Sequence, residues 1–478
     1  MAPVRERDRA ASSGERRIAL LALAAAILLG CAGPPPSTRG EAAQPFIRVG
    51  PNVRVSTAHS TDTHYEVVVA AHPHDSSRLI IGSIIYPESA ATYGTVVYHS
   101  RDGGAGWTQT LGLPALDRTG DPAMAFGPDG VAYYVASSLP AVGERRLKLF
   151  RSTDGGGMWD GPHPLTYMDR EYVTVDATAG RNRGRVYVNG NNRVPRTVSD
   201  FVVFTSTDGG RVFSGPGTRS AFGSVHATVM GNAVVVSDGT LVGVYVEASP
   251  RAGIHATWSA DGGASLASSA RIDDYVAGGE RKGAQLGNAN VEPALAIDAS
   301  GGRFTDRLYV VWPDRRSGHS QILFSSSMDR GRTWSPGRAI NDNTAADLTD
   351  QFMPEIAVNG AGVVGVTWYD RREHPDNLGW DVRFTASLDG GASFLPSVKV
   401  SERGASFPTG ASRQARPPTR PGEQQTERAQ IDVGRDSFTF MGGDTAGLAA
   451  DASGVFHAVW VDNRTGVPQV WTTVVAVK

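Results

Sequence analysis

Seven segments of the chain share one pattern of apolar and polar positions. Most begin with a polar residue, and all continue with recurring apolar side chains into a turn that contains Asp, Asn or Gly; a second apolar run follows each. This alternation, with many Val, Tyr and Trp residues, is typical of β-strands. The segments are 66–75, 121–130, 171–180, a looser one near His226, 292–301, 353–362 and 445–454. We therefore expect seven repeated sheets.

A second repeat follows the pattern Ser-x-Asp-x-Gly-x-x-Trp/Phe and occurs six times, the fourth time with Leu266 at the last position. In such a turn, Ser and Asp side chains accept hydrogen bonds from backbone N–H groups, and Gly supplies positive φ without steric cost. We therefore assign the six aspartates a structural role. They are Asp102, Asp154, Asp208, Asp261, Asp329 and Asp389.

The six turns resemble the Asp box (BNR repeat) of the sialidase superfamily. The aspartates lie 52 to 68 residues apart, close to the period of a propeller blade, which is a four-stranded sheet that cannot bury both faces alone. The resemblance implies an all-β propeller whose Asp boxes lie on the face away from the ligand. It predicts the fold better than the activity.

The strand count predicts seven blades rather than six. The last repeat lacks an Asp box because the sequence stops at Lys478, after a third strand. We expect residues 46–56 to supply its fourth strand and close the ring, since an open ring would leave a sheet edge exposed. A six-bladed ring with a spare sheet is the alternative.

The first 45 residues predict export and anchoring. Five arginines precede a short apolar run at 18–29, which ends in Leu-Leu-Gly before Cys31, the single cysteine. This resembles a bacterial lipobox. The resemblance implies a signal peptide at 1–30, acylation of Cys31 and attachment to the cell envelope, in the outer membrane if the organism has one. An ordinary signal peptide is the alternative. Residues 31–45 then form a flexible tether, and 46–478 form one propeller domain.

Two insertions interrupt the repeat. The longer one, 401–432, is rich in Arg, Pro, Gly, Ser and Gln and almost free of apolar residues, so we expect a mobile loop. It is a tolerated surface insertion, or else a lid or an arm that binds a partner. The formal net charge of −2 gives no indication of a nucleic-acid partner.

Carboxylates recur where the innermost strands begin. Ring symmetry would bring them together at the channel mouth, where converging like charges raise pKa values and attract cations. A calcium ion or an amine-bearing ligand would suit such a mouth; alternatively, each carboxylate caps backbone N–H groups or pairs with an arginine. The candidates for a catalytic role are Asp121, Asp169, Glu171, Tyr172 and Glu292.

Two further patterns supply candidates for ligand binding. Trp-x-Asp-x-Arg ends the second strand in the last three blades and favours structural pairing along the strand or between blades. Blade three departs from this motif with an Asn-rich sequence, and a departure from a repeat indicates a candidate functional site. The candidates are Arg170, Asn191, Asn192, Arg193, Asp350, Asp370, Arg371 and Asp444.

A conventional sialidase is disfavoured. Resemblance to that family implies six blades, three arginines, and a Tyr activated by a Glu. Here the nearest match to the early arginine motif is Phe46-Ile47-Arg48-Val49, in which the Arg is displaced and Pro is lacking. Glu171 and Tyr172 are adjacent and would point to opposite faces of a strand. We expect a cell-surface propeller that binds an extracellular glycan, peptide or envelope partner. A sialidase-like glycoside hydrolase is the alternative, so catalysis, the ligand and the oligomeric state stay open.

Overall fold

The computed structural model describes residues 46–87, 92–112, 118–140, 142–192, 200–219, 227–247, 252–266, 269–276, 292–344, 346–375, 379–406 and 442–478. All of them fall within one unit, Pro45–Lys478. The predictions made for the signal peptide, Cys31, the tether, Arg193 and most of the 401–432 insertion lie outside the described residues. In the described part of the chain, no helix is long and apolar enough to cross a membrane.

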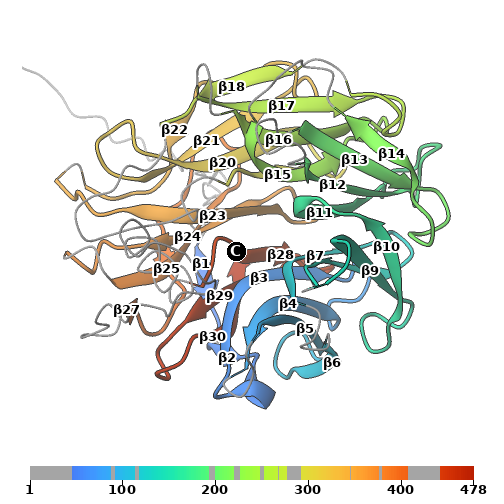
Figure 1. Cartoon of the computed structure of the whole chain (residues 1–478). Coiled ribbons are helices and arrows are strands. Elements are labelled where there is room, and N and C mark those ends of the chain that lie inside the picture. The colour runs from blue at the N-terminus through green and yellow to red at the C-terminus, as the bar shows by residue number, and fades with distance from the viewer. Residues whose placement is uncertain are drawn as a thin grey trace, which may run out of the picture. The chain divides into compact units, whose positions relative to one another are not determined.

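The strands form seven antiparallel sheets in chain order, each one blade (Figure 1). Blade one contains β3 (Thr63–Ala71), β4 (Leu79–Tyr86), β5 (Gly94–Ser100) and β6 (Thr108–Gly112). Blade two contains β7 (Thr119–Phe126), β8 (Ala132–Ser138), β9 (Arg146–Ser152) and β10 (Asp160–Thr166). Blade three contains β11 (Asp169–Val175), β12 (Val186–Asn192), β13 (Asp200–Ser206) and β14 (Ser214–Arg219).

The later blades repeat this order. Blade four contains β15 (Ala227–Val235), β16 (Leu241–Glu247), β17 (Gly253–Ser259) and β18 (Ala270–Asp274). Blade five contains β19 (Ala294–Ile297), β20 (Leu308–Asp314), β21 (Gln321–Ser327) and β22 (Arg338–Ala339). Blade six contains β23 (Gln351–Val358), β24 (Val364–Asp370), β25 (Gly379–Ser387) and β26 (Val398–Lys399), and β27 (Ala405–Ser406) also pairs with β25.

Blade seven is completed by the N-terminal strand. It contains β28 (Gly447–Ala450), β29 (Phe456–Asp462) and β30 (Gln469–Val477), and β30 pairs on its outer side with β1 (Ile47–Val49) and β2 (Val53–Arg54). Ile47 lies opposite Val477. A 3₁₀ turn, η1 (Thr57–His59), then leads into blade one. The prediction of seven blades closed by an N-terminal strand is therefore confirmed.

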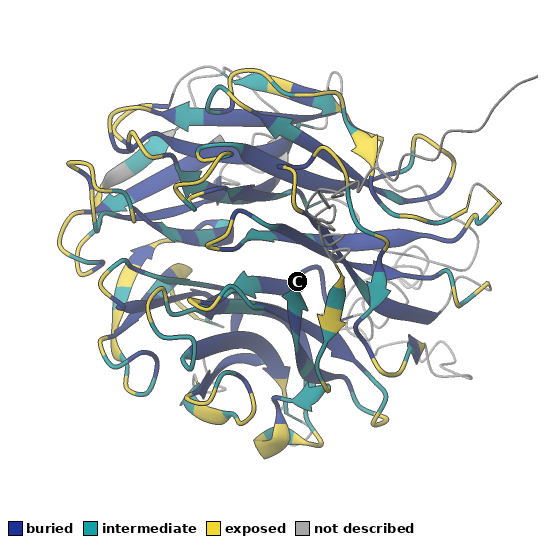
Figure 2. Ribbon diagram, turned by 180° about the vertical axis from the view of Figure 1, so that it is seen from behind, coloured by how far each residue is buried: buried dark blue, intermediate teal, exposed yellow. Residues whose placement is uncertain are grey.

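The first strands line the channel. Each contacts the first strands of both neighbouring blades, and β28 contacts β3 to complete the circle. The second strands are buried almost throughout: β8, β20, β24 and β29 have no exposed residue (Figure 2). Such strands face neighbouring blades on both sides, which explains their nearly continuous apolar sequences.

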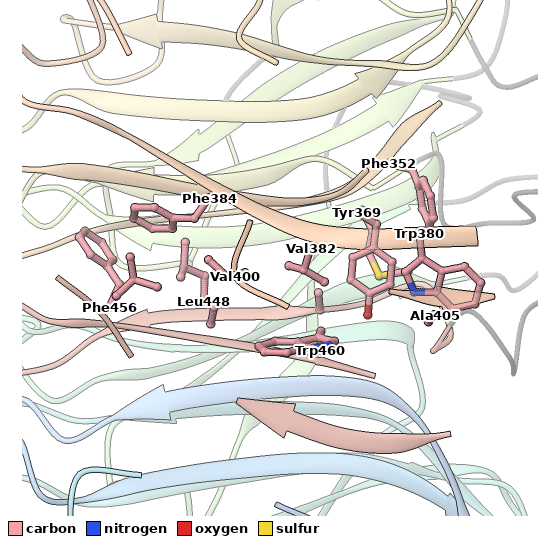
Figure 3. Packing of buried hydrophobic residues seen from close by; sticks show 14 of the residues in the cluster. Phe352, Tyr369, Trp380, Val382, Phe384, Val400, Ala405, Leu448, Phe456 and Trp460 are labelled. Atoms are coloured by element: carbon pink, nitrogen blue, oxygen red, sulfur yellow. The ribbon is translucent and has the colours of Figure 1, made fainter. Parts of the chain in front are cut away.

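Apolar side chains fill the space between blades. Between blades six and seven, Phe384, Phe456, Tyr369, Trp380 and Trp460 pack together (Figure 3). The Tyr369 and Trp380 rings are stacked, with centroids 6.5 Å apart. Large aromatic rings bury much apolar area each, so contacts of this kind dominate the energetics of a core.

The Asp boxes begin at the last residue of the third strand and form compact turns. In blade two, the Ser152 hydroxyl donates to Asp154 Oδ1 over 2.7 Å. The same Oδ1 accepts hydrogen bonds from the N–H groups of Gly157 and Met158, both at 2.9 Å. Gly156 has a φ of 107° and donates its N–H to Ser152 Oγ. The aspartate thus uses its acceptors inside the turn.

We expect Asp154→Ala to lower the free energy of unfolding by about 1–3 kcal/mol, because backbone donors to a charged acceptor lose their partner. Thermal unfolding followed by circular dichroism measures this effect. Thr153→Ala, which changes a neighbouring residue of the turn, is the matched control and should have little effect. An Asp154→Ala variant as stable as this control would contradict the structural role of the box.

The Trp-x-Asp-x-Arg motif pairs along the strand and beyond it. In blade six, Trp368 Nε1 donates to Asp370 Oδ2 over 2.7 Å, and Arg372 Nε donates to Asp370 Oδ1 over 2.9 Å. Arg372 also reaches Asp342, in the link from blade five. In blade seven, Arg464 donates to Asn52 Oδ1 over 2.9 Å, which ties the closing segment to the ring.

Candidate binding site at the channel mouth

The first strands of four blades carry a bulge near their N-terminal ends. The pairing register shifts there, and one residue in each strand has positive φ: Glu66 (53°), Asp121 (49°), Arg170 (57°) and Met353 (53°). Residues other than Gly rarely adopt this conformation, and bulges re-aim side chains. Since first and third strands run in the same direction, these bulges lie at the end of the blades opposite the Asp boxes.

Blade three corrects the alignment made from sequence. That alignment places Glu171 at the position equivalent to Glu66 and Asp121, whereas Arg170 has the equivalent backbone conformation. The alignment is wrong by one residue here because β11 has a bulge between Asp169 and Tyr172, which changes the residue that takes this position. The blade therefore places a cation, rather than another acid, among the carboxylates of its neighbours.

Arg170 is the centre of a charged group that we call the channel cluster. Its Nη1 lies 2.9 Å from Asp444 Oδ1 and 3.9 Å from Asp121 Oδ1, and its Nη2 contacts Glu292 Oε2. The side chain of Arg170 is 10% exposed, that of Glu292 13% and that of Asp121 20%. Blades two, three, five and seven thus contribute to one group. Of the three acids that contact Arg170, Asp121 and Glu292 have the more exposed side chains.

Two more carboxyl groups belong to the cluster. Burial raises the pKa of Glu66 well above its usual value, and the charges of Asp444 and Asp121 raise it further. Burial also raises the pKa of Glu355 to about 8, against the opposing effect of Arg170. Glu66 is 5% exposed, and its Oε2 has no hydrogen-bond partner among the described residues. Among the described residues, Arg170 therefore faces at least five acids.

The pKa values of the cluster follow from burial and charge. Burial raises the pKa of Asp121 to about 6, although Arg170 lowers it. Burial likewise raises the pKa of Glu292 and of Asp444, with Arg170 opposing both shifts. Burial would lower the pKa of Arg170, but Asp444 and Glu292 outweigh it and raise that pKa, so the guanidinium stays charged.

Glu171 and Tyr172 point to different sides of β11, as the strand period predicts. Tyr172 Oη lies 3.4 Å from the Met230 carbonyl oxygen and 3.5 Å from Glu292 Oε2. Burial and then Glu292 raise the pKa of Tyr172 well above its usual value, so it remains a hydroxyl. Glu171 is 3% exposed; burial and then Asp121 raise its pKa, and neither carboxyl oxygen has a hydrogen-bond partner among the described residues.

The Asn-rich end of β12 lies beside the cluster. Asn191 pairs with Asp169 across the strands, is 1% exposed, and neither of its amide atoms finds a partner in the described part of the chain. Asn189 donates from Nδ2 to the Gly231 carbonyl over 3.1 Å. Asn192 ends the strand. Buried polar atoms without partners are costly, so a ligand or water is expected to meet Asn191.

Three other candidates lie outside the channel cluster and are buried. Asp350 Oδ1 accepts the Ser320 N–H at 2.8 Å and lies 3.7 Å from Arg315 Nη1. Asp370 is held by Trp368 and Arg372, within the Trp-x-Asp-x-Arg motif of blade six. Arg371 is fully buried with its guanidinium 5.0 Å from the Phe352 ring centroid. These contacts stabilise blade six and its junction with blade five.

The sequence patterns do not single out Glu66 and Glu355 as site residues. They identify Glu66 only as the first residue of its strand. In blade six the segment reads Met353-Pro354-Glu355 where blade two reads Asp121-Pro122-Ala123. The acid thus lies two positions further along the strand, and it interacts electrostatically with Arg170 and Glu292. A search for an acid at i or i+2 would have found Glu355.

A glycine turn brings Asp444 to the cluster. The N–H of Glu66 donates to the Gly442 carbonyl over 2.7 Å. Gly443 has a φ of 86°, and a Cβ there would lie 2.5 Å from Glu66 Cγ and 2.8 Å from the Glu66 backbone nitrogen. Only Gly allows this approach without displacing Glu66.

A metal site is not assembled from the described residues. No group of three or more His, Cys, Asp or Glu side chains among them has an arrangement that could hold a metal ion. Asp121, Glu292 and Asp444 instead lie against Arg170. The calcium ion stays a prediction.

Comparison with known proteins identifies no family. No family model matches the chain, and no curated protein matches it. A protein of unknown function from Dyadobacter fermentans is 11% identical, with a TM-score of 0.49 over 90% of this chain and 99% of that one. The Hadza microbial sialidase Hz136 is 14% identical, with a TM-score of 0.44 over 88% and 67%. The α-L-arabinofuranosidase Arb93A from Fusarium graminearum is 11% identical, with a TM-score of 0.43 over 90% and 98%.

Proposed function

We propose that this protein is a lipid-anchored binding propeller of the cell surface, and that its channel mouth binds an extracellular glycan that carries amino groups. The observation that supports this proposal is the imbalance of charge in the channel cluster. Arg170 contacts three carboxylates, while Glu66 and Glu355 lie nearby within the same field. An ammonium group of a ligand would supply the missing positive charge.

Neutral polar groups favour a sugar over a peptide as the carrier of that amine. The amide of Asn191 and the hydroxyl of Thr445 are buried and have no hydrogen-bond partners among the described residues. Glu66 Oε2 also has no hydrogen-bond partner among the described residues. Sugar hydroxyls both donate and accept hydrogen bonds, so a hydroxyl-rich ring would satisfy such a mixed set of groups.

Calorimetric titration of the purified chain with glucosamine oligomers tests the proposal. We expect these oligomers to bind and their N-acetylated counterparts to bind at least about tenfold more weakly, because acetylation removes the charge. Asp121→Asn and Glu292→Gln should each weaken binding about 5- to 100-fold, equivalent to the roughly 1–3 kcal/mol of a charged hydrogen bond.

Asp389→Asn, which changes an Asp box at the opposite end of blade six, is the matched control and should leave affinity unchanged. Lysine-rich peptides form the second arm. Equal affinity for acetylated and free oligomers, or binding of the peptides alone, would contradict an amino-glycan ligand.

A glycoside hydrolase is the second candidate, and the accessible pair Asp121 and Glu292 favours it. Both acids contact the same guanidinium, so their carboxyl groups lie close together. Catalytic carboxyl groups in glycosidases are separated by up to about 9.5 Å, and the distance between Asp121 and Glu292 falls within that limit. A pKa of about 6 would let Asp121 act as an acid. Against a conventional sialidase, the channel cluster has one arginine among the described residues, whereas that family implies three arginines around an anionic sugar.

Fluorogenic glycosides, with a sialoside in the panel, separate the two candidates. Turnover that is lost in both Asp121→Asn and Glu292→Gln, and kept in Asp389→Asn, would establish the hydrolase. Saturable binding without turnover would support the binding propeller.

A further inference from the structure

We propose that two exposed arginines at the mouth end of blade two bind the carboxylates of uronic acid units, so that the ligand is a glycan in which amino sugars and uronic acids are neighbours. This inference rests on the proposed function and narrows its class of ligand. The two residues are Arg118 and Arg145, which we call the rim pair. Neither belongs to the channel cluster.

The rim pair lies in one row across the mouth end of blade two. A row of paired residues runs from Thr119 on β7 through β8 to Arg146 on β9. Arg118 and Arg145 each come one residue before this row, and the Leu139 N–H donates to the Arg118 carbonyl over 2.7 Å. Adjacent strands lie about 4.8 Å apart, so the backbones of the two arginines are about 10 Å apart.

Each guanidinium of the rim pair lies over a tyrosine ring. That of Arg118 is 5.7 Å from the ring centroid of Tyr93, which directly precedes β5 in blade one. That of Arg145 is 5.7 Å from the ring centroid of Tyr167, in the link to blade three. Both arginines are exposed, and both tyrosines are half-buried. A ring that holds a guanidinium in place reduces the entropy lost when a ligand binds, so both cations are preorganised.

Tyr93 connects one side of the rim pair to the channel cluster. Its ring centroid lies 6.5 Å from that of Tyr65, the residue before Glu66. A Cβ at Gly120, the residue before Asp121, would lie 3.7 Å from Tyr93 Cε2. The ring therefore lies beside the bulges that carry two acids of the cluster.

Tyr167 makes the corresponding connection on the other side. Burial raises the pKa of its hydroxyl, and the charges of Asp169 and then Asp121 raise it further, so it lies within the field of these acids. Arg118 is itself only three residues before Asp121, at most about 10 Å along an extended chain. The rim pair is thus close enough to the channel cluster for neighbouring units of one oligosaccharide to reach both.

The rim pair forms no ion pair with an acid in the described part of the chain. Arginines at the mouth ends of blades five to seven differ, because the arginine of each Trp-x-Asp-x-Arg motif pairs with the aspartate of its own motif. On blade two, Glu144 pairs with Arg146 rather than with Arg145. The two exposed guanidiniums can therefore meet an anion from outside the chain.

The two charged regions together select the ligand. The donors of a guanidinium form a fork that matches the two oxygens of a carboxylate. An ammonium group would lie among the acids of the channel cluster while the carboxylate of the next unit lies at the rim pair. A ligand with ammonium groups alone would leave the rim pair unused, and one with carboxylates alone would be repelled by the cluster.

Calorimetric titration with three hexasaccharides tests the inference. The mixed hexasaccharide alternates glucosamine, with free amines, and glucuronic acid. The second contains glucosamine only, and the third is the mixed hexasaccharide with its amines acetylated. We expect the mixed hexasaccharide to bind at least about tenfold more tightly than either of the others, because only it satisfies both charged regions.

Variants of the rim pair locate the effect. Arg118→Gln and Arg145→Gln should each weaken binding of the mixed hexasaccharide about 3- to 10-fold and change that of the glucosamine hexasaccharide less than about twofold. Both residues are exposed, so the thermal unfolding midpoints should stay unchanged. Arg211→Gln, an exposed residue of an Asp box at the opposite end of the ring, is the matched control and should leave every affinity unchanged.

Equal affinity for the mixed and the glucosamine hexasaccharides, or rim variants that weaken both equally, would overturn this inference and leave the proposed function intact. Equal affinity for the mixed and the acetylated hexasaccharides would instead contradict the proposed function, because the ammonium would add nothing. Tighter binding of an O-sulfated glucosamine hexasaccharide than of the mixed one would overturn the assignment to carboxylates. Absence of binding by all of them would overturn both proposals.

Discussion

Replacing Arg170 with Met is expected to lower the free energy of unfolding by about 3–5 kcal/mol at pH 7, the usual cost of removing one partner from a buried ionic group. Asp444 and Glu292 would lose their hydrogen-bonded partner, and Asp121 would lose the nearest positive charge. Methionine has a comparable length and no polar atom, so the effect comes from the charge rather than from a large cavity. We regard this as the most sensitive position of the protein.

The loss should be smaller at pH 5. The carboxyl groups of the cluster already have raised pKa values, and without Arg170 they would take up protons more readily as the pH falls. A neutral acid costs less to bury than an unpaired carboxylate. The thermal unfolding midpoints of the variant and the unmodified protein at both pH values measure the difference.

Arg211→Met is the matched control for this prediction. Arg211 is exposed and donates to the Asp208 carbonyl within an Asp box, so its replacement should change stability by no more than about 0.5 kcal/mol. Equal midpoints for the two variants at pH 7 would show that the channel cluster does not depend on its cation.

Stability of the unmodified protein is expected to fall as the pH rises from about 5 to 8. A carboxyl group whose pKa is higher in the folded state binds more protons when folded, so its stabilising effect is complete below the unfolded pKa and is lost as pH rises through the folded pKa. For Glu355 that window runs from 4.5 to about 8, and for Asp121 from 3.8 to about 6. When the folded and unfolded pKa values of a group differ by one, the free energy of unfolding changes by about 1.4 kcal/mol across its window.

Acid should also destabilise the protein, through the Asp boxes. The Gly106 N–H lowers the pKa of Asp102, and the Ser206 hydroxyl lowers that of Asp208. Such groups stabilise the fold above their unfolded pKa, and this contribution is lost as pH falls through the folded value. Together the two effects predict greatest thermal stability between about pH 4 and 5.

The Glu355→Gln variant separates the contribution of the channel cluster to the pH dependence of stability from that of the other titrating groups. Because glutamine does not titrate, this variant should lose part of the decline between pH 5 and 8 and keep the acid limb. Asp389→Asn should do the reverse, because the stabilisation that its carboxylate gives the Asp box varies with pH only below about pH 4, where it is lost. A midpoint that stays constant or rises from pH 5 to 8 in the unmodified protein would contradict the raised pKa values.

The repeat made most of the fold accessible from sequence. Ser, Asp and Gly at fixed spacing specify a turn through local hydrogen bonds and positive φ, so the six boxes could be located without any tertiary information. Counting first strands rather than Asp boxes predicted the seventh blade. The need to cover the edge of the last strand predicted that residues 46–56 close the ring, and within them β1 and β2 pair with β30.

The site was less accessible because its members come from different blades. The sequence placed acids at the starts of the first strands, and Asp121, Glu292 and Asp444 do meet at Arg170. It misplaced blade three by one residue, because a bulge changes which side chain enters the channel, and a bulge depends on how each strand pairs with its neighbour. It also missed Glu355, whose two-residue displacement matters only in the folded ring.

The sequence by itself therefore determined what local chemistry controls: the strand pattern, the Asp-box turns, the number of blades and the expectation that acids line one end of the channel. Only the tertiary structure decided that Arg170 lies among those acids and that Asp350, Asp370 and Arg371 are buried away from them. These features depend on contacts between residues far apart in the chain, such as Arg170 and Asp444, and such contacts are set by ring closure and by the packing of neighbouring blades rather than by any local preference.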